Sequence, residues 1–271
     1  NEFCISISKK PGMFGTIIHN AGYKSLGLNF SYKAFKTNNL QDAIKGVRAL
    51  EIRGCSISMP YKEKVIQYID ELDSTAKQIK AVNTIVNNNG KLIGHNTDVL
   101  SLKKCLRKNC KNKNQKILVL GAGGMTRAVL VALNYLKMKN IMITNRTRSK
   151  GKKIAKEFNL EFIPWNNRNN IQTDIIINST SIGMYPKISE LPISENVIKN
   201  AKTVVDVVSN PIKTKLITLS LKNKKNTILG TDLAFEQAIT QFKLYTGKKA
   251  PVLEMQKAIN QFYNIKNKWN Y

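Results

Sequence analysis

The sequence predicts an α/β fold of two domains, each built on a mainly parallel sheet. Short apolar runs alternate with segments of helical spacing, which is typical of parallel-sheet proteins. The 271 residues suffice for one large or two ordinary domains, and 42% of them are hydrophobic. The stretch from Lys116 to Lys150 reads strand, glycine turn, helix, strand. This order predicts that the second domain is a doubly wound, Rossmann-type domain.

Strand and helix patterns alternate in the N-terminal part of the chain. We expect strands at 3–8, 28–35, 55–59, 82–86 and 91–94. We expect helices at 16–27, 40–50, 61–68, 74–80 and 99–107. Pro60 suits the first turn of the third helix, and the polar turn Asn87–Gly90 makes 82–94 a hairpin.

The same alternation continues beyond the glycine turn. We expect strands at 117–120, 141–144, 160–163, 175–178, 203–208 and 227–229. We expect helices at 125–136, 154–158, 216–221 and 233–263, the last with a break at Gly247 and Pro251.

The glycine turn predicts a phosphate-binding site. The turn consists of Gly121, Ala122, Gly123, Gly124 and Met125. Glycine lets a backbone approach a pyrophosphate, and the N–H groups and positive dipole end of the following helix suit its charge. Thr126 stands where the GxGxxG pattern has its third glycine. An ordinary strand–turn–helix is the alternative, but the strand before and the helix after favour a dinucleotide.

The end of the next strand indicates which dinucleotide. It reads Asn145, Arg146, Thr147, Arg148, Ser149, Lys150. NAD-binding proteins usually place a carboxylate here to bind the ribose 2′-hydroxyl, and this segment has none. Cations and a hydroxyl suit a 2′-phosphate instead. The sequence therefore predicts NADP as cofactor, with solvated surface cations as the alternative.

The charge balance raises the question of nucleic acid. The chain carries 44 Lys and Arg against 17 Asp and Glu, a net charge of +27. The basic residues are spread along the chain among many asparagines, and no zinc-finger, RNA-recognition or helix-turn-helix signature is present. We expect no nucleic-acid partner. A positive field would still attract an anionic substrate and cofactor.

Other sites and compartments are less strongly indicated. The four cysteines form no CxxC pair, so we expect reduced thiols, no metal site and a cytoplasmic protein. No apolar run is long enough to span a membrane and no signal peptide is visible, so no membrane partner is expected. His19 lies in a predicted helix, where a lone histidine is more often structural than catalytic.

Several motifs together resemble the shikimate dehydrogenase family, and look like its divergent shikimate dehydrogenase-like subgroup. They are SISMPYKEKV (56–65), AVNTIV (81–86), GHNTD (94–98), GAGGMTR (121–127), NRT (145–147), NSTSIGM (178–184) and GTDLAFEQA (230–238). Their order and spacing agree with the family over nearly the whole chain. The resemblance implies a reversible, NADP-linked reduction of 3-dehydroshikimate to shikimate, a step of chorismate and aromatic amino acid biosynthesis.

The resemblance also implies the domain roles and the catalytic pair. Residues 1–100, completed by the helices of 236–271, would bind substrate, and 101–235 would bind NADP. Lys62 matches the family's catalytic lysine and Asp98 its partner aspartate. Carbonyl reduction needs a proton delivered to oxygen as hydride reaches carbon, and a lysine near a carboxylate can supply it. A surface lysine and a helix-capping aspartate are the alternative.

Further site residues follow from the same matches. Ser58, Asn83 and Gln237 match substrate-binding positions, and short polar side chains suit a polyhydroxylated ring. Thr180, Ser181, Val207 and Gly230 match positions beside the cofactor. Each could instead be a turn or cap residue.

Two departures from the family affect the substrate. The two carboxylate-binding serines before the first helix are absent, and Met13, Phe14, Gly15 and Thr16 occupy that segment. Thr16 is our candidate for a replacement hydroxyl, with Ser6 or Ser8 at the end of the first strand as the alternatives. Ser209 stands where the family usually has a tyrosine. The substrate could therefore be a related acid of the quinate or aminoshikimate type, or the chain a non-catalytic NADP-binding relative. We expect a monomer or a homodimer that binds a shikimate-like carboxylic acid.

Overall fold

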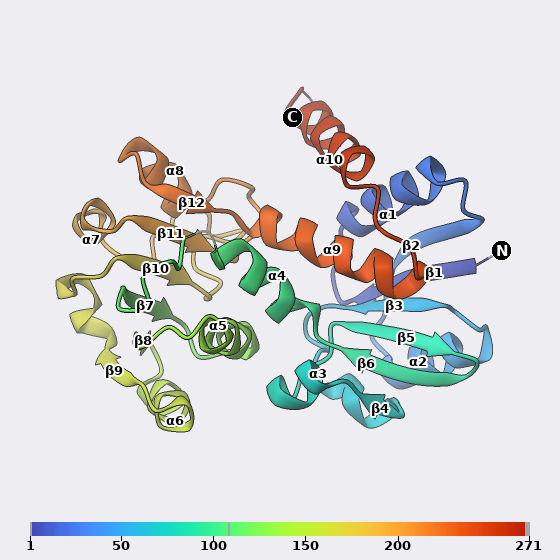
Figure 1. The fold of residues 1–271 in the computed structure, drawn as a ribbon, viewed down its shortest axis with the longest axis horizontal. Helices are drawn as coiled ribbons and strands as arrows, with labels where there is room; N and C mark the ends of the chain where they lie inside the picture. The colour runs from blue at the N-terminus through green and yellow to red at the C-terminus, as the bar shows by residue number, and fades with distance from the viewer. Residues whose placement is uncertain (1, 108, 269–271) are drawn as a thin grey trace. The chain divides into compact units, whose positions relative to one another are not determined.

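The computed structural model describes residues 2–107 and 109–268, and its chain forms two compact units (Figure 1). The first unit comprises residues 1–97 and 237–271, and the second comprises residues 98–236. Each unit contains one six-stranded sheet, so the predicted two-domain α/β fold is confirmed. Within the described residues, no helix combines the length and the apolar character needed to cross a bilayer.

The first unit has a mixed sheet in the order β2-β1-β3-β5-β6-β4. Its strands are β1 (Glu2–Ser8), β2 (Phe30–Lys36), β3 (Gly54–Ile57), β4 (Glu71–Leu72), β5 (Thr84–Asn88) and β6 (Lys91–His95). Strands β2, β1 and β3 pair in parallel, whereas β5 is antiparallel to both β3 and β6. The predicted hairpin is therefore confirmed, and it lies inside the sheet.

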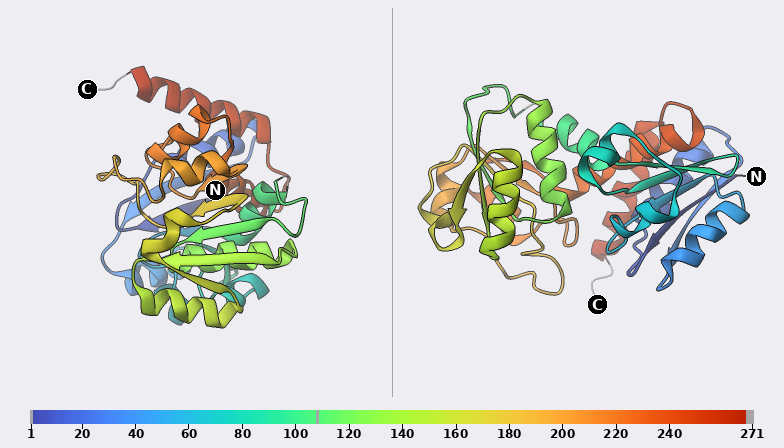
Figure 2. Two further views of the ribbon diagram at one scale, coloured as in Figure 1. Left: turned by 90° about the vertical axis from the view of Figure 1, so that its left-hand side faces the viewer. Right: turned by 90° about the horizontal axis from the view of Figure 1, so that it is seen from below.

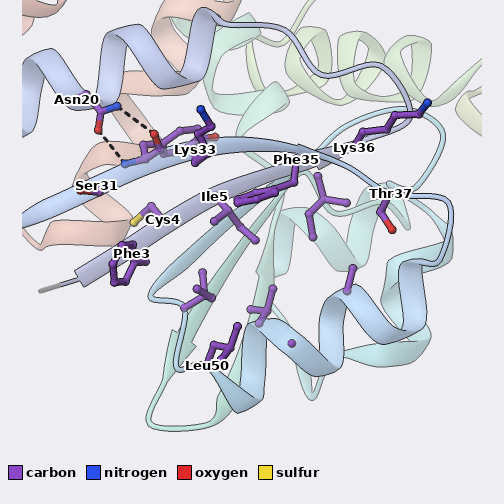
Figure 3. A pocket seen from close by; sticks show the side chains of 16 residues that line it. Phe3, Cys4, Ile5, Asn20, Ser31, Lys33, Phe35, Lys36, Thr37 and Leu50 are labelled. Carbon is purple, nitrogen blue, oxygen red and sulfur yellow. Dashed lines mark hydrogen bonds between the residues drawn. The ribbon is translucent and has the colours of Figure 1, made fainter.

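Helices cover both faces of this sheet. They are α1 (Phe14–Ser25), α2 (Leu40–Ala49), the 3-10 helix η1 (Lys64–Tyr68), α3 (Ser74–Ile79), the greater part of α9 (Gly230–Thr246) and α10 (Val252–Lys268). The Asn39 side chain caps α2 by accepting a hydrogen bond from the N–H of Asp42. Helix α2 buries Leu40, Ile44 and Val47 against the sheet, and α1 lies on the opposite face (Figure 3).

The second unit has a wholly parallel sheet in the order β12-β11-β10-β7-β8-β9. Its strands are β7 (Lys116–Leu120), β8 (Asn140–Asn145), β9 (Glu161–Pro164), β10 (Ile175–Asn178), β11 (Thr203–Asp206) and β12 (Asn226–Ile228). From β7 the strands are added toward one edge of the sheet as β8 and β9, and from β10 they are added toward the other edge as β11 and β12. The strand order therefore reverses between β7 and β10. In doubly wound folds, ligands bind at the carboxyl ends of the strands beside this reversal.

Helices also sandwich the second sheet. They are α4 (Thr97–Arg107), α5 (Gly124–Tyr135), α6 (Arg148–Phe158), the 3-10 helix η2 (Trp165–Asn170), α7 (Glu195–Asn200) and α8 (Lys215–Lys222). Figures 1 and 2 show α5 and α6 on one face and α7 and α8 on the other. Strands β10 and β11 are buried along their whole length, because both faces are covered.

Local predictions were wrong in several places. The sequence missed β4, η2 and α7, which are short, and the predicted helix at 61–68 is only a 3-10 helix over Lys64–Tyr68. A turn comes first, in which the N–H of Tyr61 donates to the C=O of Ser58 at 3.0 Å. The long C-terminal helix is interrupted between Thr246 and Val252, as Gly247 and Pro251 predict.

Candidate functional site

The turn between β7 and α5 needs glycine at its first position. Gly121 has φ of +122°, a conformation that side chains rarely adopt. A Cβ atom on Gly121 would lie 2.7 Å from the Oγ of Ser179. The Gly121 N–H donates to the C=O of Thr144 at 2.9 Å, which fixes the turn against β8. The backbone path therefore excludes any other residue here without strain.

Thr126 braces this turn. It is fully buried, and its Oγ1 accepts a hydrogen bond from the N–H of Gly123 at 3.1 Å. The same hydroxyl lies 2.9 Å from the Oγ of Ser179, which donates to the C=O of Leu120 at 2.6 Å. The departure from GxGxxG thus has a structural reason, because the threonine hydroxyl ties the turn to β7 and to the segment after β10.

The outer part of the turn has the properties of a phosphate site. Gly123 and Gly124 are exposed, and Ala122 and Met125 are half-buried beside them. Among the described residues, no heavy atom beyond Gly123 and its chain neighbours lies within 4 Å of where a Cβ on Gly123 would be. Helix α5 begins at Gly124 with no acidic residue in its first turn, and the first N–H groups of a helix have no partner within it. Open space, N–H donors and a positive dipole end fit a pyrophosphate.

The end of β8 has the properties of a second anion site. Arg146, Thr147 and Lys150 are exposed, and Asn145 is half-buried with its Nδ2 donating to the C=O of Thr147 at 2.8 Å. Helix α6 begins at Arg148, and its first turn contains no acidic residue. Cations at the positive end of a helix are unfavourable by themselves, whereas a bound anion reverses the sign of that interaction. These residues therefore fit a ribose 2′-phosphate.

The segment after β10 contains one turn residue and one accessible residue. Thr180 donates its hydroxyl to the Oδ1 of Asn178 at 2.6 Å and accepts from the N–H of Ile182 at 3.1 Å. These bonds define a turn role for Thr180. Ser181 is exposed, so its hydroxyl is accessible to a ligand.

Gly230 makes a close backbone approach at the start of α9. A Cβ there would lie 2.3 Å from the C=O oxygen of Val208 and 2.7 Å from that of Val207. Only glycine allows this approach, which places the first residue of α9 against the segment after β11. Val207 is half-buried, and its N–H donates to the C=O of Asn178 at 3.0 Å.

The sequence reasoning missed Asp206, a fully buried carboxylate at the end of β11. It accepts hydrogen bonds from Thr214 Oγ1 at 2.6 Å, Asn178 Nδ2 at 3.0 Å and the Val208 N–H at 3.1 Å. Burial raises the pKa of Asp206 to about 6, although these bonds oppose the shift. An aspartate inside the apolar run VVDVV was the available signal.

In the first unit, a backbone hydrogen bond holds Lys62 beside the residue that precedes Asn83. Lys62 is half-buried, and its C=O accepts from the N–H of Val82, the residue before Asn83, at 2.8 Å. Ser58 is exposed just after β3, with its N–H bonded to the C=O of Ile7 at 3.0 Å. Three of the predicted substrate-unit residues are therefore held near strand ends of one sheet.

Asn83 is the most constrained of these residues. It is 3% exposed, and its Oδ1 accepts three hydrogen bonds. The donors are the Thr97 N–H at 2.9 Å, the Thr97 hydroxyl at 3.1 Å and the Thr84 hydroxyl at 2.8 Å. Hydrogen bonds from the start of β5 and from the segment after β6 therefore fix the orientation of the Asn83 side chain.

The remaining predicted residues lie on helices. Asp98 is buried, is the second residue of α4 and belongs to the second unit. Gln237 is half-buried on α9 in the first unit. Thr16 lies in the first turn of α1, and its enclosed hydroxyl has no hydrogen-bond partner among the described residues. At Gly15, a Cβ would lie 3.1 Å from the hydroxyl of Tyr32, so a tyrosine occupies the space beside the missing serine.

His19 has the structural position that the sequence predicts. It is fully buried, and its ring stacks on Tyr32 at 4.6 Å between centroids, with Phe242 at 6.4 Å. Neither ring nitrogen has a hydrogen-bond partner within the described part of the chain. Burial lowers the pKa of His19 to about 4, so the ring is neutral at pH 7.

A groove of about 690 Å³ lies between α2 and strands β1 and β2 (Figure 3). Its walls carry apolar side chains such as Phe3, Phe35 and Leu50, and the α2 wall contains the small residues Ala43 and Gly46. None of the predicted site residues is among the described residues that line it. The groove is therefore separate from the predicted site.

The cysteines and acidic residues of the described part of the chain form no cluster that could hold a metal ion. All four cysteines have free thiols, and burial raises the pKa of Cys105 to about 12 and that of Cys110 to about 11. Across residues 2–107 and 109–268, no group of three or more His, Cys, Asp and Glu side chains could hold a metal ion.

Known proteins match this chain in both of its units. The family description "Shikimate dehydrogenase substrate binding domain" matches residues 8–85, and "Shikimate / quinate 5-dehydrogenase" matches residues 103–220. The shikimate dehydrogenase-like protein of Haemophilus influenzae is 42% identical over 250 residues, which is 92% of each chain. The shikimate dehydrogenase (NADP(+)) of Methanococcus maripaludis is 38% identical over 258 residues, 91% of this chain and 92% of its own.

A solved structure agrees. The shikimate 5-dehydrogenase of Thermus thermophilus, in complex with NADP(H) and shikimate, has a TM-score of 0.84 at 27% identity, covering 96% of this chain and 98% of its own. The resemblance carried by the sequence motifs is confirmed: the chain belongs to the shikimate / quinate 5-dehydrogenase family of oxidoreductases.

Proposed function

We propose that the chain catalyses the reversible, NADP-linked oxidation of shikimate to 3-dehydroshikimate, in chorismate and aromatic amino acid biosynthesis. The observation that carries the cofactor part is the β8 end, where cations replace the carboxylate that NAD would require. Relatives named shikimate dehydrogenase (NADP(+)) support the substrate part.

The second unit would hold the cofactor. The turn Gly121–Met125 fits the pyrophosphate, and Asn145, Arg146, Thr147 and Lys150 fit the 2′-phosphate. Thr180, Ser181, Val207 and Gly230 would flank the nicotinamide, Thr180 by shaping the turn and Gly230 by its backbone. Bound NADP would accept or return the hydride.

The first unit would bind the ring acid and move the proton. During oxidation Lys62 Nζ would take the proton from the reacting hydroxyl, and during reduction it would return that proton to the carbonyl oxygen. Asp98 would orient Lys62 and a ring hydroxyl. Ser58, Asn83 and Gln237 would bind further ring oxygens, and the enclosed hydroxyl of Thr16 would bind the substrate carboxylate.

The test is NADP⁺ reduction with shikimate, followed by NADPH absorbance, for the wild type and for Lys62→Ala. We expect kcat to fall by about 10²–10⁴-fold while the Kd for NADP⁺ stays unchanged. Lys64→Ala, at an exposed lysine two positions away, is the matched control and keeps full activity. Turnover that survives in Lys62→Ala would remove Lys62 from the mechanism.

A second candidate is the same reaction on a related ring acid such as quinate. Gly15 in place of a serine and Ser209 in place of a tyrosine favour it. The first change removes a hydroxyl expected near the substrate, and the second moves one onto a much shorter side chain. A panel of cyclohexene and cyclohexane acids separates the two. NADP binding with turnover of no acid in the panel would indicate a non-catalytic relative.

A further inference from the structure

The groove of about 690 Å³ between α2 and strands β1 and β2 has no role in the proposed function. Its volume is that of a site for a small molecule, and its lining is mainly apolar. We propose that this groove binds a small carboxylate with an apolar body, such as an aromatic acid, and that Lys33 and Lys36 hold the anionic group. The inference goes beyond the proposed function and does not depend on it.

The apolar surface of the groove is the part of the sheet face that α2 leaves uncovered. In the register of β1 with the edge strand β2, Ile5 pairs with Lys33 and Ile7 with Phe35. Ile7 is 2% exposed, whereas Phe3 is 48% and Phe35 is 49% exposed, although both lie in strands. Removal of such apolar surface from water is favourable, so an apolar group in the groove would be stabilised.

The α2 wall of the groove is set back at Gly46. Among the described residues, no atom outside its own helix backbone and chain neighbours lies within 4 Å of where a Cβ on Gly46 would be. Gly46 does not have a positive φ either. A glycine inside a helix is less stable than an alanine, and neither crowding nor backbone conformation requires one here. Its effect is to leave space beside the sheet.

Two cations without a counter-ion lie on the strand side of the groove. Lys33 and Lys36 line it, both are exposed, and neither has an ion-pair partner among the described carboxylates. The described lining contains no acidic residue. Asp42, which adjoins the lining on α2, is already paired with Lys45 at 3.2 Å. The charge of the groove therefore favours an anionic ligand.

The groove has an apolar end and a cationic end. Figure 3 shows Phe3 and Leu50 at one end and Lys36 at the other. The exposed residues Glu2 and Glu51 adjoin Phe3 and Leu50 in the sequence, so negative charge is found only beside the apolar end. We therefore expect the apolar body of the ligand between Phe3 and Leu50 and its carboxylate toward Lys36.

The structure favours a small molecule over a strand from another chain. An edge strand such as β2 can pair with a further strand through its free backbone groups. Here the Tyr32 N–H donates to Asn20 Oδ1 at 2.8 Å, and Asn20 Nδ2 donates to the Tyr32 C=O at 3.0 Å (Figure 3). These bonds occupy the groups that a further strand would use, and the net charge of +27 opposes the approach of a second copy.

The first experiment tests the charge of the ligand by isothermal titration of the full chain. The probes are 1-naphthaleneacetate and its neutral analogue 1-naphthaleneacetamide, which share one apolar body. We expect one acetate per chain with a Kd below about 1 mM, and an amide Kd about fivefold higher. The double variant Lys33→Gln/Lys36→Gln should bring the two Kd values within about twofold of each other by weakening the acetate alone.

The control for charge is the double variant Lys24→Gln/Lys77→Gln. Both lysines are exposed, lie in the same unit and are absent from the described lining of the groove. This variant loses the same net charge, and it should keep the wild-type preference for the acetate. An equal loss of preference in both double variants would assign the effect to the general positive field, which overturns the role of Lys33 and Lys36.

The second experiment tests the location by filling the groove. Gly46→Leu places a side chain in the open space, so it should weaken both probes by about tenfold or more without lowering the melting temperature, since leucine favours a helix. Gln41→Leu adds the same side chain to α2 at an exposed position outside the lining, and it should bind both probes as the wild type does.

Three results would overturn the inference. They are no binding of either probe at up to about 5 mM, equal affinity of the wild type for both probes, and undiminished binding in Gly46→Leu. Sedimentation gives a fourth, because a wild-type dimer that Gly46→Leu dissociates would assign the groove to a second copy. All four leave the proposed function standing, since that function is measured separately by turnover of shikimate.

Discussion

The two sheets of this chain present their functional groups in different ways. The second unit has only parallel pairings, and its site consists of turns at strand ends in which backbone N–H groups and glycines predominate. The first unit has a mixed sheet, and its site consists of side chains held by hydrogen bonds between distant segments. In the proposed function, phosphate recognition would therefore depend on local backbone shape, whereas ring recognition would depend on tertiary contacts.

A substitution in the glycine turn has the largest expected effect on stability. It also tests the difference between the two units most directly. Gly121→Ala should lower the free energy of unfolding of the second unit by about 4 kcal/mol, because alanine would be strained at this φ and would contact Ser179. Its neighbour Gly123→Ala meets open space, so it should change that free energy by less than about 0.5 kcal/mol while weakening NADP⁺ binding. Hydrogen exchange resolves each unit. Equal losses of stability would contradict the assigned backbone roles.

His19 offers a pH test confined to the first unit. Its pKa in the folded chain, about 4, lies below the ordinary value of 6.5, so folding is favoured above pH 6.5 and this contribution is lost as the pH falls toward 4. Relative to His19→Phe, the wild type should lose about 3 kcal/mol of unfolding free energy between pH 7 and pH 4. Urea titrations across this range measure the difference. Parallel curves for the two proteins would mean that folding leaves the pKa of His19 unshifted.

Asp206 offers the opposite pH dependence in the second unit. Its folded pKa of about 6 lies above the ordinary 3.8, so its contribution is present below pH 3.8 and is lost as the pH rises through 6. Relative to Asp206→Asn, the wild type should lose up to about 3 kcal/mol over this interval. Hydrogen exchange in β10 and β11 reports the change. A gain of stability with rising pH would show that the three hydrogen bonds outweigh burial.

Substitution of a cation at the β8 end has the smallest expected effect, a change in the Kd for NADP⁺. It tests which residues of the second unit act on the 2′-phosphate. Arg146→Ala should raise the Kd for NADP⁺ by about tenfold and leave the Kd for NAD⁺ unchanged, because only the former carries a 2′-phosphate. Lys152→Ala, an exposed lysine further along α6, is the control and should change neither value. Isothermal titration with both cofactors measures this, and an equal loss for both would assign Arg146 to the general positive field.

Sequence reasoning worked best where the structure is local. The strands of the second unit and its helices α5 and α8 were predicted with small errors at their ends, because buried parallel strands read as apolar runs and Gly121 follows one directly. The helix predicted at 154–158 covers only the second half of α6. Short elements such as β4 and α7 were missed, since two or six residues carry too little periodicity. The helix predicted at 61–68 failed because the turn at Ser58–Tyr61 competes with it.

The sequence by itself determined the fold class, the family and the absence of a carboxylate after β8, and it predicted the phosphate loop. Each of these depends on neighbouring residues, whose chemistry and spacing are visible in the chain. Only the tertiary structure decided that Thr126 braces the glycine turn, that Asp206 is buried between two strand ends, and that Gln241 donates to the hydroxyl of Thr84, 157 residues away in the chain. The physical reason is that a hydrogen bond between distant segments depends on where folding places its two partners, and no local pattern encodes that placement.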